Sequence, residues 1–217
     1  MTFFPRTAGL ALVLASSVFI ASCGGGGDVN NELAFRVIHA SPDSPPVNIL
    51  VDGVPLRSGV DYRQGTGFTF VTPRTYRFGI EAILPGDDAL IIDQSVPLVA
   101  GSEFTVLALG KDATDTVHSL IIENTFQEIP AGNARVQFVH GAPDAPVLDV
   151  YLTPEGASLP ASTPVITVTY DEYPADRQLI PPGEYVLRVT PAGDPDTVLF
   201  DSGPLGSLSN RADLLFV

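Results

Sequence analysis

The chain contains no tryptophan, one methionine, one cysteine and three histidines among 217 residues. A single cysteine excludes an internal disulfide, and so few histidines fall short of the three or four ligands of a usual zinc site. Lysine and arginine number 11 against 25 acidic residues, which gives a formal net charge of -14. Because phosphate contacts need clustered basic residues, this balance argues against nucleic acid as a partner. We expect no metal and no cofactor, and an acidic surface that serves solubility.

Glycine and proline are abundant, with 20 residues each, and hydrophobic residues make up 45% of the chain. This combination is typical of many short strands joined by turns rather than of long helices. The composition therefore predicts an all-β protein.

Residues 1–22 have the pattern of a secretory signal peptide, in which Arg6 precedes an apolar run from Ala8 to Ile20. The run is too short to span a membrane. The segment that ends in Ala-Ser-Cys23 resembles the lipobox of bacterial lipoproteins, which implies cleavage before Cys23 and lipid on its sulfur. A general signal peptide with an incidental cysteine is the alternative. Since Cys23 is the only cysteine, a role outside the fold explains it best.

Residues 23–32 are predicted to be the lipidated cysteine and a flexible tether, because four glycines follow Cys23 directly. Gly24 stands where an aspartate would resemble the inner-membrane retention signal. We therefore expect a protein that is exported from the cytoplasm and anchored by lipid in the cell envelope, in the outer membrane if the host is Gram-negative.

One stretch occurs twice, as His39-Ala-Ser-Pro42-Asp43-Ser-Pro45 and as His140-Gly-Ala-Pro143-Asp144-Ala-Pro146. The His, Pro, Asp and Pro recur in the same register without a gap, which indicates two homologous domains in tandem. The pattern resembles the bacterial domain of unknown function 4397 family, whose members carry a His-Ala-Ser-Pro-Asp-Ala-Pro stretch near the start of a β-sandwich module. This resemblance covers almost the whole mature chain and implies a fold and a cellular setting, but no activity.

The repeat predicts two tandem β-sandwich domains, immunoglobulin-like or transthyretin-like, at residues 33–127 and 133–217. They follow the signal peptide and the Gly-rich tether. In the second domain the segment Leu214 to Val217 aligns with Phe104 to Leu109, and nothing aligns with Val117 to Glu123. We therefore expect the second domain to be one strand short. Three arrangements are open: the domain is complete with one strand fewer, the first domain or the loop Thr153 to Pro164 covers the edge, or a second chain pairs there.

Two interpretations of the repeated turn remain. In the first, a histidine and the aspartate four residues later form a general base, as His39 with Asp43 and His140 with Asp144. Ser41 is replaced by alanine in the second copy, so a Ser-His-Asp triad would exist once at most. In the second interpretation each histidine closes the apolar face of its strand and bonds to backbone, while each aspartate caps its own Pro-Asp turn.

Calcium and glycan ligands have weaker support. Three loops offer oxygen ligands, at residues 86–88, 112–115 and 193–196, but none matches the twelve-residue calcium loop. The tyrosines considered as stacking groups for a sugar are Tyr62, Tyr151 and Tyr170.

Our leading hypothesis is a non-enzymatic envelope protein, attached to the membrane through lipid at Cys23, whose two sandwiches bind an envelope protein or a glycan. The alternatives are a hydrolase that uses His39 or His140, and a lipoprotein that carries a small ligand.

Overall fold

The computed structural model describes residues 14–15, 32–114, 116–174 and 177–217. The lipidation site Cys23, the glycines of the tether and most of the predicted signal peptide lie outside these residues. The described residues form an all-β protein with four sheets, arranged as two β-sandwiches. Within them no helix is long and apolar enough to cross a membrane.

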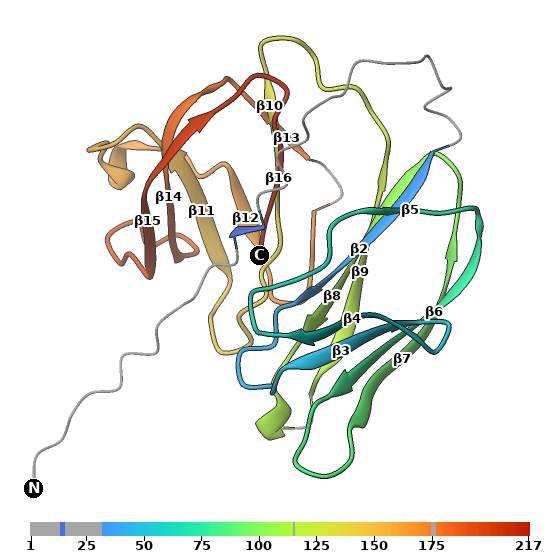
Figure 1. Cartoon of the computed structure of the whole chain (residues 1–217). Helices are drawn as coiled ribbons and strands as arrows, with labels where there is room; N and C mark the ends of the chain where they lie inside the picture. The colour runs from blue at the N-terminus through green and yellow to red at the C-terminus, as the bar shows by residue number, and fades with distance from the viewer. Residues whose placement is uncertain (1–13, 16–31, 115, 175–176) are drawn as a thin grey trace, which may run out of the picture.

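The first sandwich follows Glu32 and has eight strands (Figure 1). These are β2 (Leu33–His39), β3 (Val47–Val51), β4 (Val54–Val60), β5 (Thr69–Phe70), β6 (Arg74–Ala82), β7 (Ala89–Leu98), β8 (Ser102–Leu109) and β9 (His118–Thr125). One sheet has the order β5-β2-β8-β9 and the other β4-β3-β6-β7. β2 and β8 are parallel, and the remaining neighbours are antiparallel.

The second sandwich repeats this strand order. Its strands are β10 (Ala134–Phe138), β11 (Leu148–Thr153), β12 (Ile166–Val168), β13 (Gln178–Ile180), β14 (Gly183–Pro191), β15 (Phe200–Leu208), β16 (Asp213–Phe216) and, from the start of the chain, β1 (Leu14–Ala15). The orders are β13-β10-β16-β1 and β12-β11-β14-β15. β10 and β16 are parallel, as β2 and β8 are. β16 therefore takes the place of β8, as the alignment of Leu214 to Val217 with Phe104 to Leu109 predicts.

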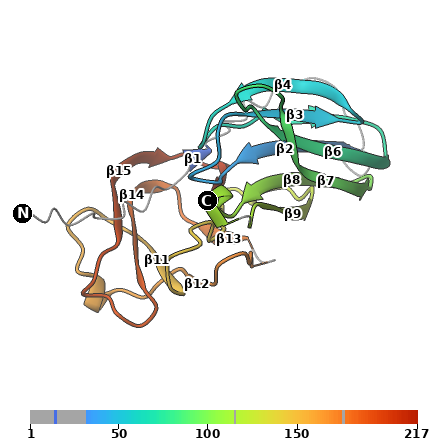
Figure 2. The ribbon, with the colours of Figure 1, turned by 90° about the horizontal axis from the view of Figure 1, so that it is seen from below.

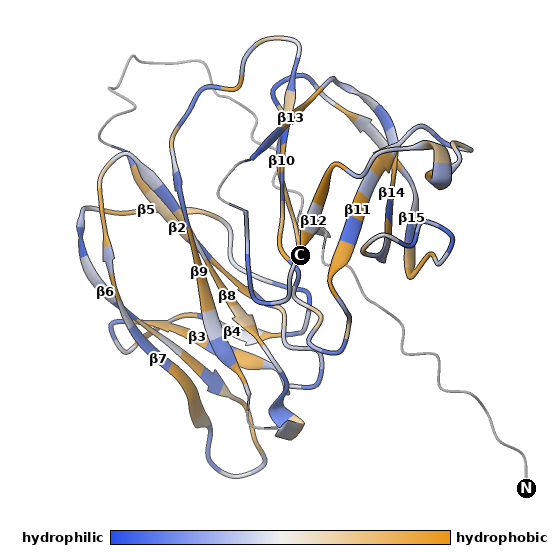
Figure 3. Ribbon diagram, turned by 180° about the vertical axis from the view of Figure 1, so that it is seen from behind, coloured by the Kyte–Doolittle hydropathy of each residue, from blue (hydrophilic) through white to orange (hydrophobic). Residues whose placement is uncertain are grey.

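Each sandwich has its own apolar core, because alternate residues of its strands point between the two sheets. In the first core the rings of Phe35 and Phe78 meet edge to face, with centroids 5.0 Å apart. In the second core Phe138 stacks on Phe216 at 5.2 Å. Figure 3 shows the apolar residues along β9, β11 and β12.

The two sandwiches also pack against each other, and Figure 2 shows them side by side. Residues of β2, β8 and β9 that point away from the first core meet residues of β10 and β16 that point away from the second. The buried residues of this cluster are Ile38, Ala40, Leu107, Leu109, Ile122, Val139, Leu215 and Val217. Both faces of β2 are therefore covered, and all seven of its residues are buried. Four sheets follow one another across the molecule.

Polar contacts strengthen this interface. The side-chain amides of Asn124 and Gln137 exchange hydrogen bonds of 2.9 and 3.3 Å. The guanidinium of Arg177 lies 3.2 Å from the carboxylate of Glu103. These contacts act in addition to the short linker, Gln127 to Asn133, and hold the sandwiches together.

The free edge predicted for the second sandwich is occupied by β1. Leu14 pairs with Phe216 and Ala15 with Leu215, in antiparallel register. In the first sandwich the corresponding place belongs to β9, where Ile121 pairs with Val106 of β8. None of the three arrangements considered for this edge includes a strand from the predicted signal peptide. The structure thus adds an arrangement that sequence reasoning missed.

Candidate functional site

The histidines of the repeated turn are buried and bond to backbone carbonyls. The Nε2 atom of His39 lies 3.3 Å from the carbonyl oxygen of Pro45, and that of His140 lies 2.9 Å from the carbonyl oxygen of Pro146. A carbonyl only accepts, so each Nε2 carries the proton. Burial lowers the pKa of both imidazoles, although these hydrogen bonds act in the opposite direction. This is the geometry that the structural interpretation of the turn requires.

Each imidazole also meets a tyrosine ring edge to face. The ring centroids of His39 and Tyr62 are 6.4 Å apart, and those of His140 and Tyr170 are 5.9 Å apart. In both copies the residue after the tyrosine has a positive φ, 69° and 61°. Sequence reasoning missed this recurrence because the loop before Tyr170 is longer. Both rings are half-buried and Tyr151 is buried, so these tyrosines offer little free ring face to a sugar.

The aspartates of the repeat do not cap their own turns, so that prediction was wrong. Asp43 accepts hydrogen bonds from the backbone N–H groups of Asp112, at 2.8 Å, and Ala113, at 3.2 Å. It thereby caps the short 3-10 helix that begins at Asp112. Asp144 forms an ion pair with Lys111. Both carboxylates therefore reach the loop after β8, and Asp144 links the two sandwiches.

The catalytic arrangements considered from the sequence do not form. Asp43 and Asp144 contact the loop after β8 and not the imidazoles. Ser41 donates to the carbonyl oxygen of Gly110 at 2.9 Å and lies 2.7 Å from the hydroxyl of Ser44. Within the described ranges of the chain, moreover, there is no group of three or more His, Cys, Asp and Glu side chains that would hold a metal ion.

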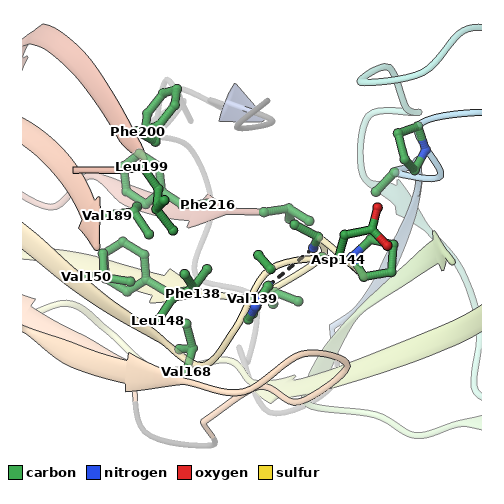
Figure 4. A pocket seen from close by; sticks show the side chains of 18 of the residues that line it. Phe138, Val139, Asp144, Leu148, Val150, Val168, Val189, Leu199, Phe200 and Phe216 are labelled. Carbon is green, nitrogen blue, oxygen red and sulfur yellow. Dashed lines mark hydrogen bonds between the residues drawn. The ribbon is translucent and has the colours of Figure 1, made fainter. Parts of the chain in front are cut away.

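The described residues line a partly open apolar cavity of about 400 Å³, which lies between the two sheets of the second sandwich and reaches the first sandwich. This volume lies within the usual range of ligand sites, roughly 300–1,000 Å³. Figure 4 shows apolar side chains gathered at one end and Asp144 at the other. The side chains that form the apolar end include Phe138, Leu148, Val150, Val168, Val189 and Phe216.

The second copy of the repeated turn forms one end of this cavity. His140, Pro143 and Asp144 line it, and Pro42 reaches it from the first sandwich. His39 and Asp43 lie outside its wall. The structure thus brings four of the six predicted turn residues to one place. The remaining two serve the first sandwich, where Asp43 caps the loop after β8.

The two cores differ in the strand at their edge, which is β9 in the first and β1 in the second. β9 has eight residues, and from this strand and its start Ile121 and Val117 pack against the first core. Among the described residues, β1 pairs with β16 at two positions. In the second sandwich, no other described residue fills the space next to β16.

The third histidine, His118, was not used in the sequence analysis, and it joins the two sandwiches. The Nε2 atom of His118 lies 2.8 Å from the carboxylate of Asp171, and its Nδ1 atom lies 2.8 Å from the carbonyl oxygen of Thr116. Burial opposes protonation of His118, but the hydrogen bonds to Thr116 and Asp171 and the charge of Asp171 outweigh it, so the pKa is raised. The partner lies 53 residues away, and no local pattern indicates it.

The fold and the cavity define a class of protein: two packed β-sandwiches, of which the second has an apolar cavity. The family model described as Domain of unknown function (DUF4397) matches residues 34–151, more than half of the chain. The chain belongs to this family, as the repeated turn predicts. The match covers the first sandwich and continues through β10 to Tyr151, so it includes both copies of the turn. No curated protein matches the chain.

Proposed function

We propose that this protein is a non-enzymatic, lipid-anchored binding protein of the cell envelope, and that it binds an apolar group in the cavity of the second sandwich. The observation that carries the proposal is the cavity itself, about 400 Å³ of apolar space between two sheets. A ligand that enters it removes apolar surface from water, which contributes about 25 cal/mol for each Å². A carrier of small apolar ligands is one form of this proposal.

The geometry of the turn supports binding rather than catalysis. Both imidazoles donate to backbone carbonyls, and burial lowers their pKa. Neither contacts the aspartate that would orient a general base. The hydrolase alternative therefore has no arrangement of described side chains in its favour.

The envelope location is supported by the sequence pattern of residues 1–22 and by Cys23. Several acyl chains on one cysteine anchor a protein stably, since each buried CH₂ contributes about 0.8 kcal/mol. We expect Cys23→Ala to release the protein into the soluble fraction, as measured by detergent phase partition. A Cys23→Ala protein that stays in the detergent phase after its leader is cleaved would contradict the anchor.

Binding is tested with a neutral apolar fluorophore, N-phenyl-1-naphthylamine. Its fluorescence should rise on addition of the protein, and Val168→Phe should weaken binding by about tenfold or more, because the new ring fills the cavity. Val54→Phe is the matched control, since Val54 is 66% exposed in the first sandwich. Equal binding by both variants, or no binding by the unaltered protein, would overturn the proposal.

A further inference from the structure

We infer that the cavity and the adjoining edge of β16 together accept an extended strand from a second protein of the envelope. The strand pairs antiparallel with β16 and directs a branched apolar side chain into the cavity from the position opposite Phe216. This inference rests on the proposed binding function and specifies its ligand as a segment of polypeptide.

The structure shows that this edge accepts a strand. Leu14 and Ala15 pair with Phe216 and Leu215 in antiparallel register. The N–H and C=O groups of β16 on this side are therefore directed toward a neighbouring strand. Removal of the leader, as proposed above, takes β1 away and exposes these groups.

The first sandwich shows what a full-length strand does at this position. Val106 of β8 pairs with Val37 of β2, and Phe216 of β16 pairs with Phe138 of β10. Val37 and Phe138 align in the repeat, so Val106 and Phe216 occupy equivalent positions. Ile121 of β9 stands opposite Val106 and packs against the first core. Leu14 of β1 holds the position opposite Phe216 in the structure, so a strand that replaces β1 would place its own residue there, next to the cavity that Phe216 lines.

The tether of this chain does not supply such a strand. Residues 24–32 include four glycines and a single apolar residue, Val29. A strand that fills a core requires apolar residues at alternate positions. The outer face of β16 is already occupied, since Leu215 and Val217 are buried against the first sandwich. Once the leader and β1 are removed, the side of β16 without a neighbour among the described residues is its edge and the cavity next to it, which fits a strand from another protein.

The test uses the processed chain, beginning at residue 23 with Cys23→Ser, and a fluorescent peptide with the sequence of residues 117–125. This peptide reproduces β9 and places an isoleucine opposite Phe216. The matched control is the same peptide with Ile121→Asp. We expect the first peptide to bind, the control to bind at least about tenfold more weakly, and the amides of β16 to gain protection from hydrogen exchange.

The other outcomes separate this inference from the proposed function. If N-phenyl-1-naphthylamine binds and neither peptide does, the strand-acceptor inference is overturned and the apolar site stands. If nothing binds, both fail. Equal binding of the two peptides would show that no side chain enters the cavity and would overturn the inference. If the processed chain does not fold, β1 is an integral strand of the second sandwich, and the inference is overturned. The inference is also overturned if the processed chain dimerises and the amides of β16 are already protected from exchange without peptide.

Discussion

The first and second sandwiches have the same strand order but differently closed cores. In the first, the eight-residue β9 covers the edge of β8 and contributes Ile121 to the core. In the second, β1 pairs over two residues, and a cavity of about 400 Å³ remains. Among the described residues, the two copies thus differ both in the strand at this edge and in the space left in the core.

The largest expected effect comes from removing the side chain that closes the first core. Ile121→Ala should lower the free energy of unfolding by about 2 kcal/mol, the low end for a large-to-small change, since Ile121 is only partly buried. Urea unfolding measures this loss. The variant should also gain a second site for the apolar fluorophore, whereas Ile121→Val should not. A loss no larger than that of Ile121→Val would show that β9 does not close the core.

A matched pair of substitutions compares the two cores directly. Val60 pairs with Val47 in the first sandwich, and Val168 pairs with Leu148 at the equivalent place in the second. Val60→Leu should cost about 1–2 kcal/mol, the lower part of the range for overpacking, because it adds one CH₂ to a filled core. Val168→Leu should instead stabilise by up to about 0.8 kcal/mol, because its extra CH₂ enters the cavity. Both values come from urea unfolding, and losses of similar size at the two sites would contradict the comparison.

The two aspartates of the repeat should also differ. Asp43→Ala removes the acceptor of two backbone N–H groups and should cost about 1 kcal/mol. Asp144→Ala should change the free energy of unfolding by less than about 0.5 kcal/mol, since its side chain is 74% exposed in the ion pair with Lys111. Thermal or urea unfolding would check this, and equal losses would show that Asp144 has a further partner.

The smallest expected effect is the pH dependence of the contact between the sandwiches. The pKa of His118 in the folded protein lies above its ordinary value of 6.5. Its stabilisation is therefore fully present below about pH 6.5 and is lost as the pH rises through the folded pKa. His118→Gln should cost less than about 1 kcal/mol at about pH 5.5, and less again at about pH 8.5.

Urea unfolding at the two pH values measures this difference. Unfolding is measured for the unaltered protein and for His118→Gln at each pH. The lowered pKa values of His39 and His140 change the stability with pH in the opposite direction, and they do so equally in both proteins, so the difference between the two isolates His118. Asp171→Asn is the control and should remove the same pH dependence. An identical cost of His118→Gln at both pH values would exclude the ion pair as its cause.

Local pattern was sufficient for much of the fold. The alternation of Phe35 and Val37 predicts the inner face of β2, and Asp52-Gly53 predicts the two-residue hairpin turn between β3 and β4, where both φ angles are positive. Alternation also places Arg36 and Ile38 on the opposite face. It does not predict that this face is buried too, since its cover is a second sandwich more than 90 residues away.

The candidate site was harder to predict, because its parts are distant in sequence. The repeated turn indicated His140, Pro143 and Asp144, which do line the cavity. The partners of Asp43 lie 69 and 70 residues away, so its capping role was assigned to the wrong turn. The cavity lies where the described residues place no side chain between the two sheets, and no sequence motif indicates such a space.

Xenon binding tests the central claim, that the second core is open and the first is filled, most directly. Xenon binds in apolar cavities of proteins. Methyl resonances of the processed chain would be recorded with and without the gas. The account predicts shifts at Val150, Val168 and Val189, which line the cavity, and none at Val47 and Val106 of the first core. Shifts of equal size in both sandwiches, or in neither, would contradict it.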